Sequence, residues 1–337
     1  MSKKILCIGS MNKDVFFPYD NLSFIETPED TLSKKKMVVE VGAKYRSQDR
    51  FESSGGCATN VAQGLSRLEV PVALISNVGR DELGEALLKE VKEEGVDTTF
   101  VSIKEDCRTD LSAIIVDEMS GERTVFYNRD ANETFSFREE MFSGAKAVFV
   151  SGLYGDWKEA VASIRTLTER FSLPLYYNPS HSNVCDDPSL VWDMIRNSRG
   201  VFMNKDEAME FLMKLKDIYA SEQLFDIDEE RLESEEYLAM FLAREGSCEF
   251  IVITDGSRGA WVYERSDDAV HHRQADHPEK IIDSTGAGDA FTSGFLGAKF
   301  SDKDTKTALT WGIQNATNVI KYYGGKSGLL KKEHIQE

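Results

Sequence analysis

Residues 283–294 read DSTGAGDAFTSG, a glycine-rich turn with an aspartate on either side. The turn, Gly286–Ala287–Gly288, follows KIID at 280–283, where we expect a short strand, and opens a segment with helical potential. Backbone N–H groups at the start of a helix form an anion site, and small residues let a phosphate approach closely. Asp289 would lie beside that site. A carboxylate that takes a hydroxyl proton, next to N–H groups that hold phosphoryl oxygens, is what phosphoryl transfer to a hydroxyl requires.

The local sequence also allows simpler interpretations of the two aspartates, Asp289 and Asp283. Asp289 is also a favourable acidic residue for the first turn of a helix. Asp283 begins an Asp–Ser–Thr run that can stabilise its own turn.

Two other glycine loops do not meet the requirements of phosphate motifs. The stretch YGGKSG at 323–328 contains Gly-Lys-Ser, but Ile320 stands where a P-loop needs its first glycine, and the stretch follows a helical pattern. The stretch GSMNKD at 9–14 follows a strand pattern but lacks the later glycines of a dinucleotide fingerprint. A dinucleotide-dependent oxidoreductase is therefore disfavoured.

Short apolar runs alternate with helical patterns along most of the chain, which predicts βαβ units and a mostly parallel sheet. We expect strands within 4–10, 72–79, 145–152, 173–180, 200–204 and 249–264, and helices within 58–69, 81–95, 157–171, 205–215, 288–300 and 307–324. Ligands bind at the carboxyl ends of the strands in such sheets, so the loops after strands should carry the chemistry.

Three segments do not follow this alternation of strands and helices. Residues 31–54 and 98–130 alternate apolar and polar positions without a long helix, which predicts antiparallel strands outside the main sheet, as a lid or an interface. Residues 217–240 are helical in pattern but strongly acidic, which favours a solvated surface insertion.

Composition limits the class of partner. The chain has 337 residues, 40 Lys and Arg against 58 Asp and Glu, and a net charge of −18, so neither nucleic acid nor an anionic membrane is an expected partner. No apolar run reaches transmembrane length, and we expect a cytoplasmic protein. The five cysteines contain no CxxC pair, which indicates neither a disulfide framework nor a zinc site.

Several motifs together resemble one known family. DSTGAGDAFTSGF looks like the C-terminal signature of the ribokinase-like (PfkB) family of sugar and nucleoside kinases, and SGGCATNVAQGLSRL at 54–68 looks like its N-terminal signature. GSMNKD, NVGRDELGEALL at 77–88, NKDE at 204–207 and TDGSRGAW at 254–261 follow in family order. The resemblance implies one kinase domain over 1–337, with a three-layer α/β/α fold, a mostly parallel central sheet and a small antiparallel β lid. It also implies ATP and Mg²⁺.

The resemblance assigns roles at the reacting end of the site. Asp289 is the implied general base, and Gly286, Ala287 and Gly288 form the implied anion hole. Asp283 and Thr285 lie where family members often bind a monovalent cation, which would be K⁺.

The resemblance also assigns acceptor and nucleotide residues. The implied substrate-binding residues are Asn12, Asp14, Gly55, Gly56, Asn60 and Arg129. The implied nucleotide-side residues are Asn204, Glu207, Thr254, Gly256, Gly259 and Asn315, and the first two would hold Mg²⁺ through water. Asn204 and Glu207 also have the spacing of a capping box, and the two interpretations are compatible.

The acceptor stays open from sequence. Arg129 in TVFYNRDAN could meet an acidic or hydroxylated substrate or be a surface residue of the lid, and GLYGD at 152–156 departs from the pattern that holds ribose in ribokinases. The leading hypothesis is an ATP-dependent kinase of a sugar or sugar-like molecule. The alternatives are a nucleoside kinase of the adenosine type and a non-catalytic sugar- or nucleotide-binding protein. A homodimer through the lid is a further possibility.

Overall fold

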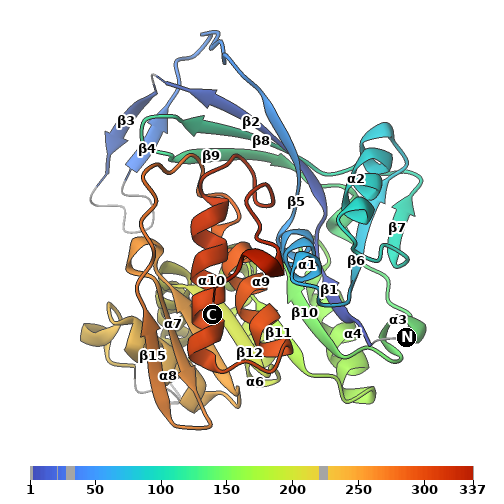
Figure 1. Cartoon of the computed structure of the whole chain (residues 1–337), viewed down its shortest axis with the longest axis vertical. Coiled ribbons are helices and arrows are strands. Elements are labelled where there is room, and N and C mark those ends of the chain that lie inside the picture. The colour runs from blue at the N-terminus through green and yellow to red at the C-terminus, as the bar shows by residue number, and fades with distance from the viewer. Residues whose placement is uncertain (1–2, 21, 28–34, 220–226, 337) are drawn as a thin grey trace.

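The computed structural model describes residues 3–20, 22–27, 35–219 and 227–336 (Figure 1). Its main element is a nine-stranded sheet. In spatial order the strands are β15 (Ala269–Arg273), β14 (Ala260–Glu264), β13 (Phe250–Thr254), β12 (Gly200–Asn204), β11 (Leu175–Asn178), β10 (Ala147–Ser151), β1 (Ile5–Ile8), β6 (Val72–Gly79) and β7 (Val101–Lys104). Neighbours from β13 to β7 are parallel, whereas β14 and β15 pair antiparallel at one edge.

Helices cover both faces of this sheet. Within β1, Ile5 and Cys7 belong to one hydrophobic cluster, and Leu6 and Ile8 belong to the other, as the alternation of side chains along a strand requires. The first cluster includes side chains of α1 (Cys57–Arg67), α2 (Glu82–Glu93), α9 (Ala287–Phe300) and α10 (Thr305–Val319). The second includes those of α3 (Glu139–Phe142), α4 (Trp157–Arg170), α5 (His181–Asp186), α6 (Pro188–Arg196), α7 (Lys205–Tyr219) and α8 (Glu235–Glu245). The predicted three-layer α/β/α fold is therefore confirmed.

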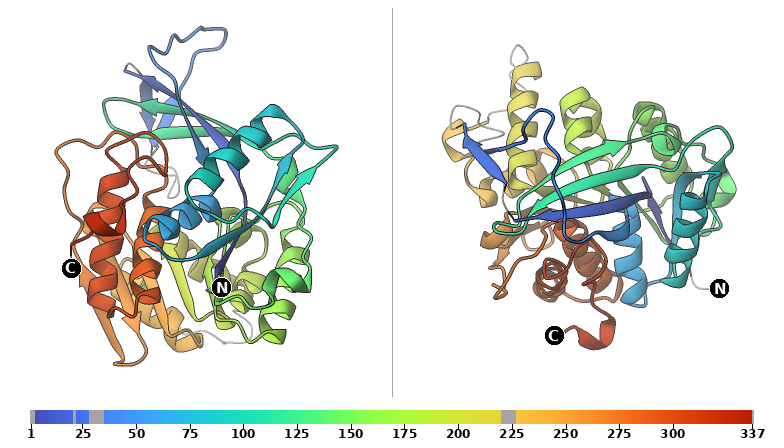
Figure 2. Two further views of the ribbon diagram at one scale, coloured as in Figure 1. Left: turned by 45° about the vertical axis from the view of Figure 1, so that its right-hand side comes forward. Right: turned by 90° about the horizontal axis from the view of Figure 1, so that it is seen from above.

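A second sheet forms the lid at the top of Figure 1. Its strands, in spatial order, are β5 (Phe51–Gly55), β2 (Asn12–Tyr19), β8 (Leu111–Asp117) and β9 (Arg123–Asn128). Both outer pairings are antiparallel, and the central β2–β8 pairing is parallel. In the view from above (Figure 2, right) these strands lie nearest the viewer, over the rest of the molecule. Along β2, residues with even numbers are buried and residues with odd numbers are partly exposed, so one face of the lid looks into the molecule.

Two details of the predicted lid are wrong. In the segment 98–130, β7 pairs with β6 at the edge of the main sheet, because the chain between α2 and β7 is short enough to return beside β6. In the segment 31–54, residues 31–34 lie outside the described residues, β5 joins the lid, and β4 (Lys35–Val38) pairs with β3 (Ser23–Glu26) as a separate two-stranded sheet. The sequence analysis also missed that Asn12 and Asp14 belong to a lid strand and not to a loop.

The acidic segment 217–240 is not a solvated insertion where the structure describes it. Residues 220–226 lie outside the described residues. Beyond them, Ile227, Leu232 and Leu238 are buried in the hydrophobic cluster on the α8 side of the sheet. Glu235 is also buried, and it pairs with Lys205 and Arg258. In the sequence, the many acidic residues made it difficult to recognise the apolar residues between them, which pack against the sheet.

Among the described residues, no helix combines the length and the apolar character needed to cross a lipid bilayer.

Candidate active site

The glycine turn at 286–288 begins α9, as predicted, but the strand expected before it at 280–283 is wrong, because that segment has no strand assignment. Gly286 is the N-cap residue with φ of 76°, and a Cβ there would lie 2.4 Å from Cα of Gly325. Only glycine satisfies both conditions, because the left-handed backbone and the close approach each exclude a side chain. Gly288 is exposed, and a Cβ there would meet nothing within 4 Å. The first N–H groups of a helix have no partner within the helix; Ala287 N donates to the carbonyl oxygen of Ser284 at 3.3 Å, so the N–H groups that follow it are the candidates for binding an anion at the start of α9.

Asp289 lies in the first turn of α9 and is buried. The pKa of Asp289 is raised to about 7, mainly by burial and to a smaller extent by the nearby carboxylates of Asp14 and Glu207. Hydrogen bonds from Asn60 and Cys57 act in the opposite direction. A carboxyl group with a pKa near neutrality exchanges its proton readily at physiological pH, which suits general acid–base chemistry.

Asn60 is the partner that orients Asp289. Asn60 Nδ2 donates a hydrogen bond to Asp289 Oδ2 at 2.8 Å. The two residues meet because α1 and α9 pack closely, and a Cβ on Gly64 of α1 would lie 2.1 Å from Oγ of Ser293 on α9. Asn60 Oδ1 is buried and has no hydrogen-bond partner. A buried acceptor without a donor is costly, so this oxygen marks a position where a ligand hydroxyl fits.

The inner face of the lid brings a second carboxylate to the same place. Asn12 Nδ2 donates hydrogen bonds to Asp14 Oδ1 at 2.5 Å and to Ser112 Oγ at 3.1 Å. Burial raises the pKa of Asp14 to about 6; Ser112, Asn12 and Arg129 lower this pKa, and Asp283 raises it. The carboxylate of Asp14 on the lid is therefore close enough to Asp289 on α9 to raise the pKa of Asp289.

The paired glycines before α1 make this packing possible. A Cβ on Gly55 would lie 2.0 Å from Asp14 Oδ2, so Gly55 gives the carboxylate its space. Gly56 has φ of 100°, and a Cβ there would lie 2.2 Å from the carbonyl oxygen of Ser10. In this structure the two glycines leave space for polar groups of the protein itself, namely the Asp14 carboxylate and the Ser10 carbonyl oxygen.

Arg129 follows β9 and lies between two aromatic rings. Its guanidinium carbon is 4.8 Å from the ring centroid of Tyr127 and 4.6 Å from that of Tyr154. Nε and Nη1 of Arg129 are buried without hydrogen-bond partners. The side chain is therefore held in place by ring stacking while two of its donor atoms are unsatisfied.

Asp283 is fully buried and ties two loops together. Its Oδ1 accepts hydrogen bonds from Thr285 N at 2.9 Å and Thr285 Oγ1 at 2.7 Å, and its Oδ2 accepts one from Gly324 N at 3.1 Å. These bonds form the self-stabilised turn that the sequence allowed, and they also connect it to the glycines of 323–328. Asp283 and Asp289 therefore have different surroundings.

The residues expected on the nucleotide side lie at the ends of neighbouring strands. Asn204 ends β12, and Thr254, which ends β13, is its neighbour in the parallel register. Asn204 N donates to Glu207 Oε2 at 3.0 Å, and Glu207 N donates to Asn204 Oδ1 at 2.8 Å, which is a reciprocal capping box. Burial raises the pKa of Glu207. Gly256 is exposed, with φ of 41° and open space where a Cβ would stand.

The comparison with protein families identifies the family of this chain. The model described as pfkB family carbohydrate kinase matches residues 2–332. The chain belongs to the PfkB family of carbohydrate kinases. It is thus an enzyme that transfers a phosphoryl group to a hydroxyl acceptor.

Individual PfkB relatives differ in substrate. The chain is 30% identical to an uncharacterized sugar kinase of Archaeoglobus fulgidus, over 79% of this chain and 98% of the relative. It is 28% identical to the ATP-dependent ribose-1-phosphate kinase of Halopiger xanaduensis, over 91% of this chain and 88% of that one. Among solved structures, ribokinase from Cryptococcus neoformans in complex with ADP superimposes with a TM-score of 0.76 at 19% identity, covering 99% of both chains.

One residue predicted from the PfkB resemblance does not face a ligand. Asn315 on α10 is fully buried, and its Nδ2 donates to the carbonyl oxygen of Ala290 and to Oγ of Ser293. Its Oδ1 accepts from Leu330 N at 2.8 Å. The assignment of Asn315 to the adenine side is wrong because its amide is already used to join α9, α10 and the segment that follows.

Gly259 also has an internal role. It is buried with φ of 94°, and a Cβ there would lie 2.0 Å from the carbonyl oxygen of Arg273 on β15. The predicted turn into β14 is confirmed, and it positions Thr254 and Gly256 indirectly.

The sequence analysis missed several residues that this PfkB site contains. Cys57 was interpreted as a small buried hydrophobe, but it lies beside Asp289, whose charge is the largest of the causes that raise the pKa of the Cys57 thiol. Ser112 was not considered, and Tyr154 was noted only as part of GLYGD at 152–156, without a role of its own. Ser112 could have been found from the alternation in β8, where its position faces the interior between two apolar neighbours. No local signal marks Tyr154.

Proposed function

We propose that this protein transfers the γ-phosphoryl group of ATP to a hydroxyl of a sugar or sugar-like molecule, with Asp289 as the general base. The observation that carries the proposal is the position of Asp289. It lies at the open start of α9, its pKa is raised to about 7, and it is beside the unpartnered Oδ1 of Asn60.

The reacting hydroxyl would lie between α1 and the start of α9. Asp289 accepts its proton as the oxygen attacks, and Asn60 Oδ1 accepts a hydrogen bond from a second hydroxyl of the acceptor. The N–H groups of Ala287, Gly288 and their neighbours hold the charge that develops on the phosphoryl oxygens. Asp14 and Asn12 bind the acceptor from the lid, because they are buried on the face that looks toward Asp289.

Asn204 and Glu207 are suited to hold Mg²⁺ through water. Mg²⁺ prefers oxygen ligands and keeps several of its waters, and when bound it neutralises charge on the phosphates. Glu207 lies close enough to raise the pKa of Asp289, so it is on the reacting side of α7. Thr254 and Gly256 would line the nucleotide beside it, since β12 and β13 are neighbours.

We favour an acceptor that carries an anionic group. Arg129 has two buried donor atoms without partners, and a carboxylate or phosphate on the acceptor would satisfy them. The rings of Tyr127 and Tyr154 lie against Arg129, so they are less available to stack on a nucleobase. This contact disfavours the nucleoside alternative, and the family membership disfavours a non-catalytic binding protein.

Potassium is a separate proposal. Asp283 and Thr285 organise the loop before α9 and connect it to Gly324, so a monovalent cation bound to carbonyl oxygens there would stabilise the same junction. Activity should then rise when K⁺ is added to buffer free of Na⁺ and K⁺, and Asp283→Ala should weaken that response. A native enzyme without a response would remove K⁺ from the mechanism and leave Asp289 in place.

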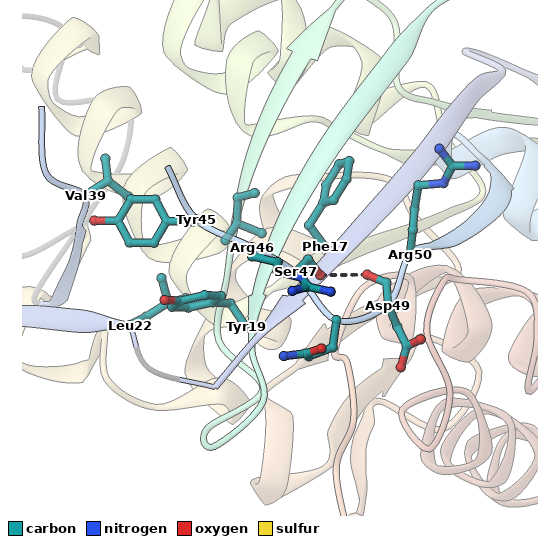
Figure 3. A pocket seen from close by; sticks show the side chains of 11 residues that line it. Phe17, Tyr19, Leu22, Val39, Tyr45, Arg46, Ser47, Asp49 and Arg50 are labelled. Carbon is teal, nitrogen blue, oxygen red and sulfur yellow. Dashed lines mark hydrogen bonds between the residues drawn. The ribbon is translucent and has the colours of Figure 1, made fainter. Parts of the chain in front are cut away.

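Dimerisation through the lid is also a proposal. On the outer face, a cavity of about 670 Å³ is lined by Phe17, Tyr19, Leu22, Val39 and Tyr45, among others (Figure 3). Nearby, Phe126 on β9 is 62% exposed. A second copy would cover this apolar face. Light scattering should give the mass of a dimer, and Phe17→Glu should give that of a monomer; a native monomer would contradict the proposal.

The test of function is a panel of acceptors with ATP and Mg²⁺, scored by ADP release. The panel pairs each neutral sugar with its phosphorylated and carboxylated forms and includes nucleosides. We expect turnover with an anionic sugar, a rate that rises with pH through about 7, and loss of the anionic preference in Arg129→Gln. Turnover of nucleosides alone would reject the sugar assignment, and a pH-independent rate would reject Asp289 as the base.

A further inference from the structure

Three side chains that the proposed reaction does not use converge on the surface between α5 and α7. His181 and Cys185 are one turn apart on α5, and Glu210 faces them from α7. His181 Nε2 is 2.8 Å from Glu210 Oε2, Cys185 Sγ is 3.6 Å from His181 Nε2, and Cys185 Sγ is 3.3 Å from Glu210 Oε1. All three ligand atoms lie within 4.8 Å of one another.

Two of these separations are close to the edges of a zinc coordination tetrahedron. Bonds of about 2.3 Å to sulfur and about 2.0–2.2 Å to nitrogen or oxygen give ligand–ligand edges of roughly 3.4–3.6 Å. The two edges to sulfur, 3.6 and 3.3 Å, are already close to these values. The His181–Glu210 contact, at 2.8 Å, is made by the other carboxylate oxygen, Oε2, and an edge through it would have to lengthen by about 0.6 Å when an ion replaces the proton.

The helices that carry these side chains are anchored below them. Ser180 caps α5 by accepting a hydrogen bond from Asn183 N, and Asn183 Nδ2 donates to the carbonyl oxygen of Leu153 at 3.2 Å. Val184 on the other side of α5 is fully buried. The Glu210 side chain is only 11% exposed, whereas that of His181 is 59% exposed, so the fourth position of the tetrahedron faces solvent.

We propose that His181, Cys185 and Glu210 form a zinc site with an open fourth position, separate from the magnesium of the phosphoryl-transfer reaction. Histidine, thiolate and carboxylate are all zinc ligands, and their softness favours zinc over the magnesium expected at Asn204 and Glu207. The bound ion would join α5, which follows β11, to α7, which follows β12. The ion would therefore cross-link these two helices near the N-terminal end of α7, where Glu207 lies on the proposed nucleotide side.

Two existing contacts compete with the ion. Lys214 Nζ is 3.6 Å from Glu210 Oε1 and must give up that contact. Burial and the neighbouring Glu210 raise the pKa of the Cys185 thiol, so binding displaces a proton from sulfur. Zinc affinity should therefore rise with pH, and Lys214→Met should strengthen it.

The test uses the whole protein, freed of metal with a chelator and without ATP or Mg²⁺. Zinc is titrated by calorimetry, and cobalt(II) is used as a spectroscopic probe. We expect one equivalent of zinc to bind, and cobalt to give a thiolate-to-metal charge-transfer band with tetrahedral visible bands. Cys185→Ser should abolish the charge-transfer band and weaken zinc binding by at least about tenfold, since even partners outside the coordination shell are worth about ten- to a hundredfold.

Cys107→Ser is the matched control, because Cys107 is a partly exposed cysteine elsewhere in the chain. It should bind both metals as the native protein does. Melting curves in chelator establish that each variant is folded, and added zinc should raise the melting temperature of the native protein and of Cys107→Ser but not of Cys185→Ser. Cobalt binding without a thiolate band, or native zinc affinity in Cys185→Ser, would overturn the proposal.

Discussion

The proposed acceptor side and the proposed nucleotide side of the site are built differently. On the acceptor side, Asp14, Asn60 and Arg129 bring buried polar groups together, and the last two have atoms without hydrogen-bond partners. On the nucleotide side, Asn204 and Glu207 satisfy each other in a capping box, and Gly256 is open to solvent.

The difference indicates where specificity is set. Buried polar groups without partners reject a ligand that fails to complete them, so the acceptor side should be selective. Exposed backbone at helix starts binds phosphates of any nucleotide, so the other side should be more tolerant. Substitutions should therefore separate the two sides by the kinetic constant that each one changes.

The largest effect is expected where the two sides meet. Asp289→Asn keeps the shape and removes the proton acceptor, so kcat should fall by roughly 10²–10⁴-fold while acceptor and ATP binding are largely kept. Steady-state kinetics and ligand titration measure the two effects. Asp302→Asn, just after the same helix, is the control and should keep native kcat. A near-native kcat in Asp289→Asn would exclude this residue as the base.

Gly288→Val tests the phosphate end. Its side chain enters space that is empty of protein atoms, so the variant should fold, but it would stand where the phosphoryl group approaches the backbone. Turnover should fall by about 10²–10³-fold, the usual effect of losing a donor to a developing anion. Gly286→Val is the contrast, because its Cβ would collide with Gly325 and should destabilise the fold as well. Native turnover in folded Gly288→Val would mean that the phosphates bind elsewhere.

Asp14→Ala tests the acceptor side. Losing a charged hydrogen bond to a hydroxyl costs about 1.5–3 kcal/mol, so KM for the acceptor should rise roughly ten- to a hundredfold while KM for ATP changes little. Asp20→Ala, at the exposed end of the β2 region, is the control. Equal changes in both KM values would contradict the division between the two sides.

The smallest effect concerns stability. The pKa of Asp289 is about 7 in the folded protein and 3.8 in its ordinary state, so the folded state binds the proton more tightly than the unfolded chain does. The contribution of the protonated Asp289 carboxyl group to the free energy of unfolding is therefore fully present at pH below about 4 and is lost as pH rises through 7. Asp289→Asn should melt above the native protein at pH 8, on the order of a few degrees, and the gap should shrink as pH falls toward 4. A gap independent of pH would mean that Asp289 does not titrate in this range.

Much of the fold follows from local patterns in the sequence. Fully apolar runs such as residues 5–8 and 147–150 identified central parallel strands, because strands covered on both faces have no polar side. The position of β7 was not predictable in the same way. Its alternating pattern suits either the lid or a sheet edge, and only pairing with β6 decides between them.

The site was predictable where backbone geometry restricts the residue type. The turn at Gly286 and the capping box at Asn204 each have a local signature, and both formed as expected. Residues that act through contacts distant in sequence were harder to predict. Asn315 looked available on its helix, and its burial depends on Ala290, Ser293 and Leu330, which no local pattern brings together.

The central position of β1 bears on how the chain is made. β1 is synthesised before both of its neighbours in the sheet, β6 and β10, and β10 begins at Ala147. Sheets with such long-range pairings fold slowly, and incomplete chains expose unpaired strands. Asp289 and the glycines that Gly286 touches are synthesised later still. A nascent chain therefore carries the proposed acceptor residues of β2 before the proposed base, Asp289, is made, and during that interval β1 and β2 need protection from aggregation.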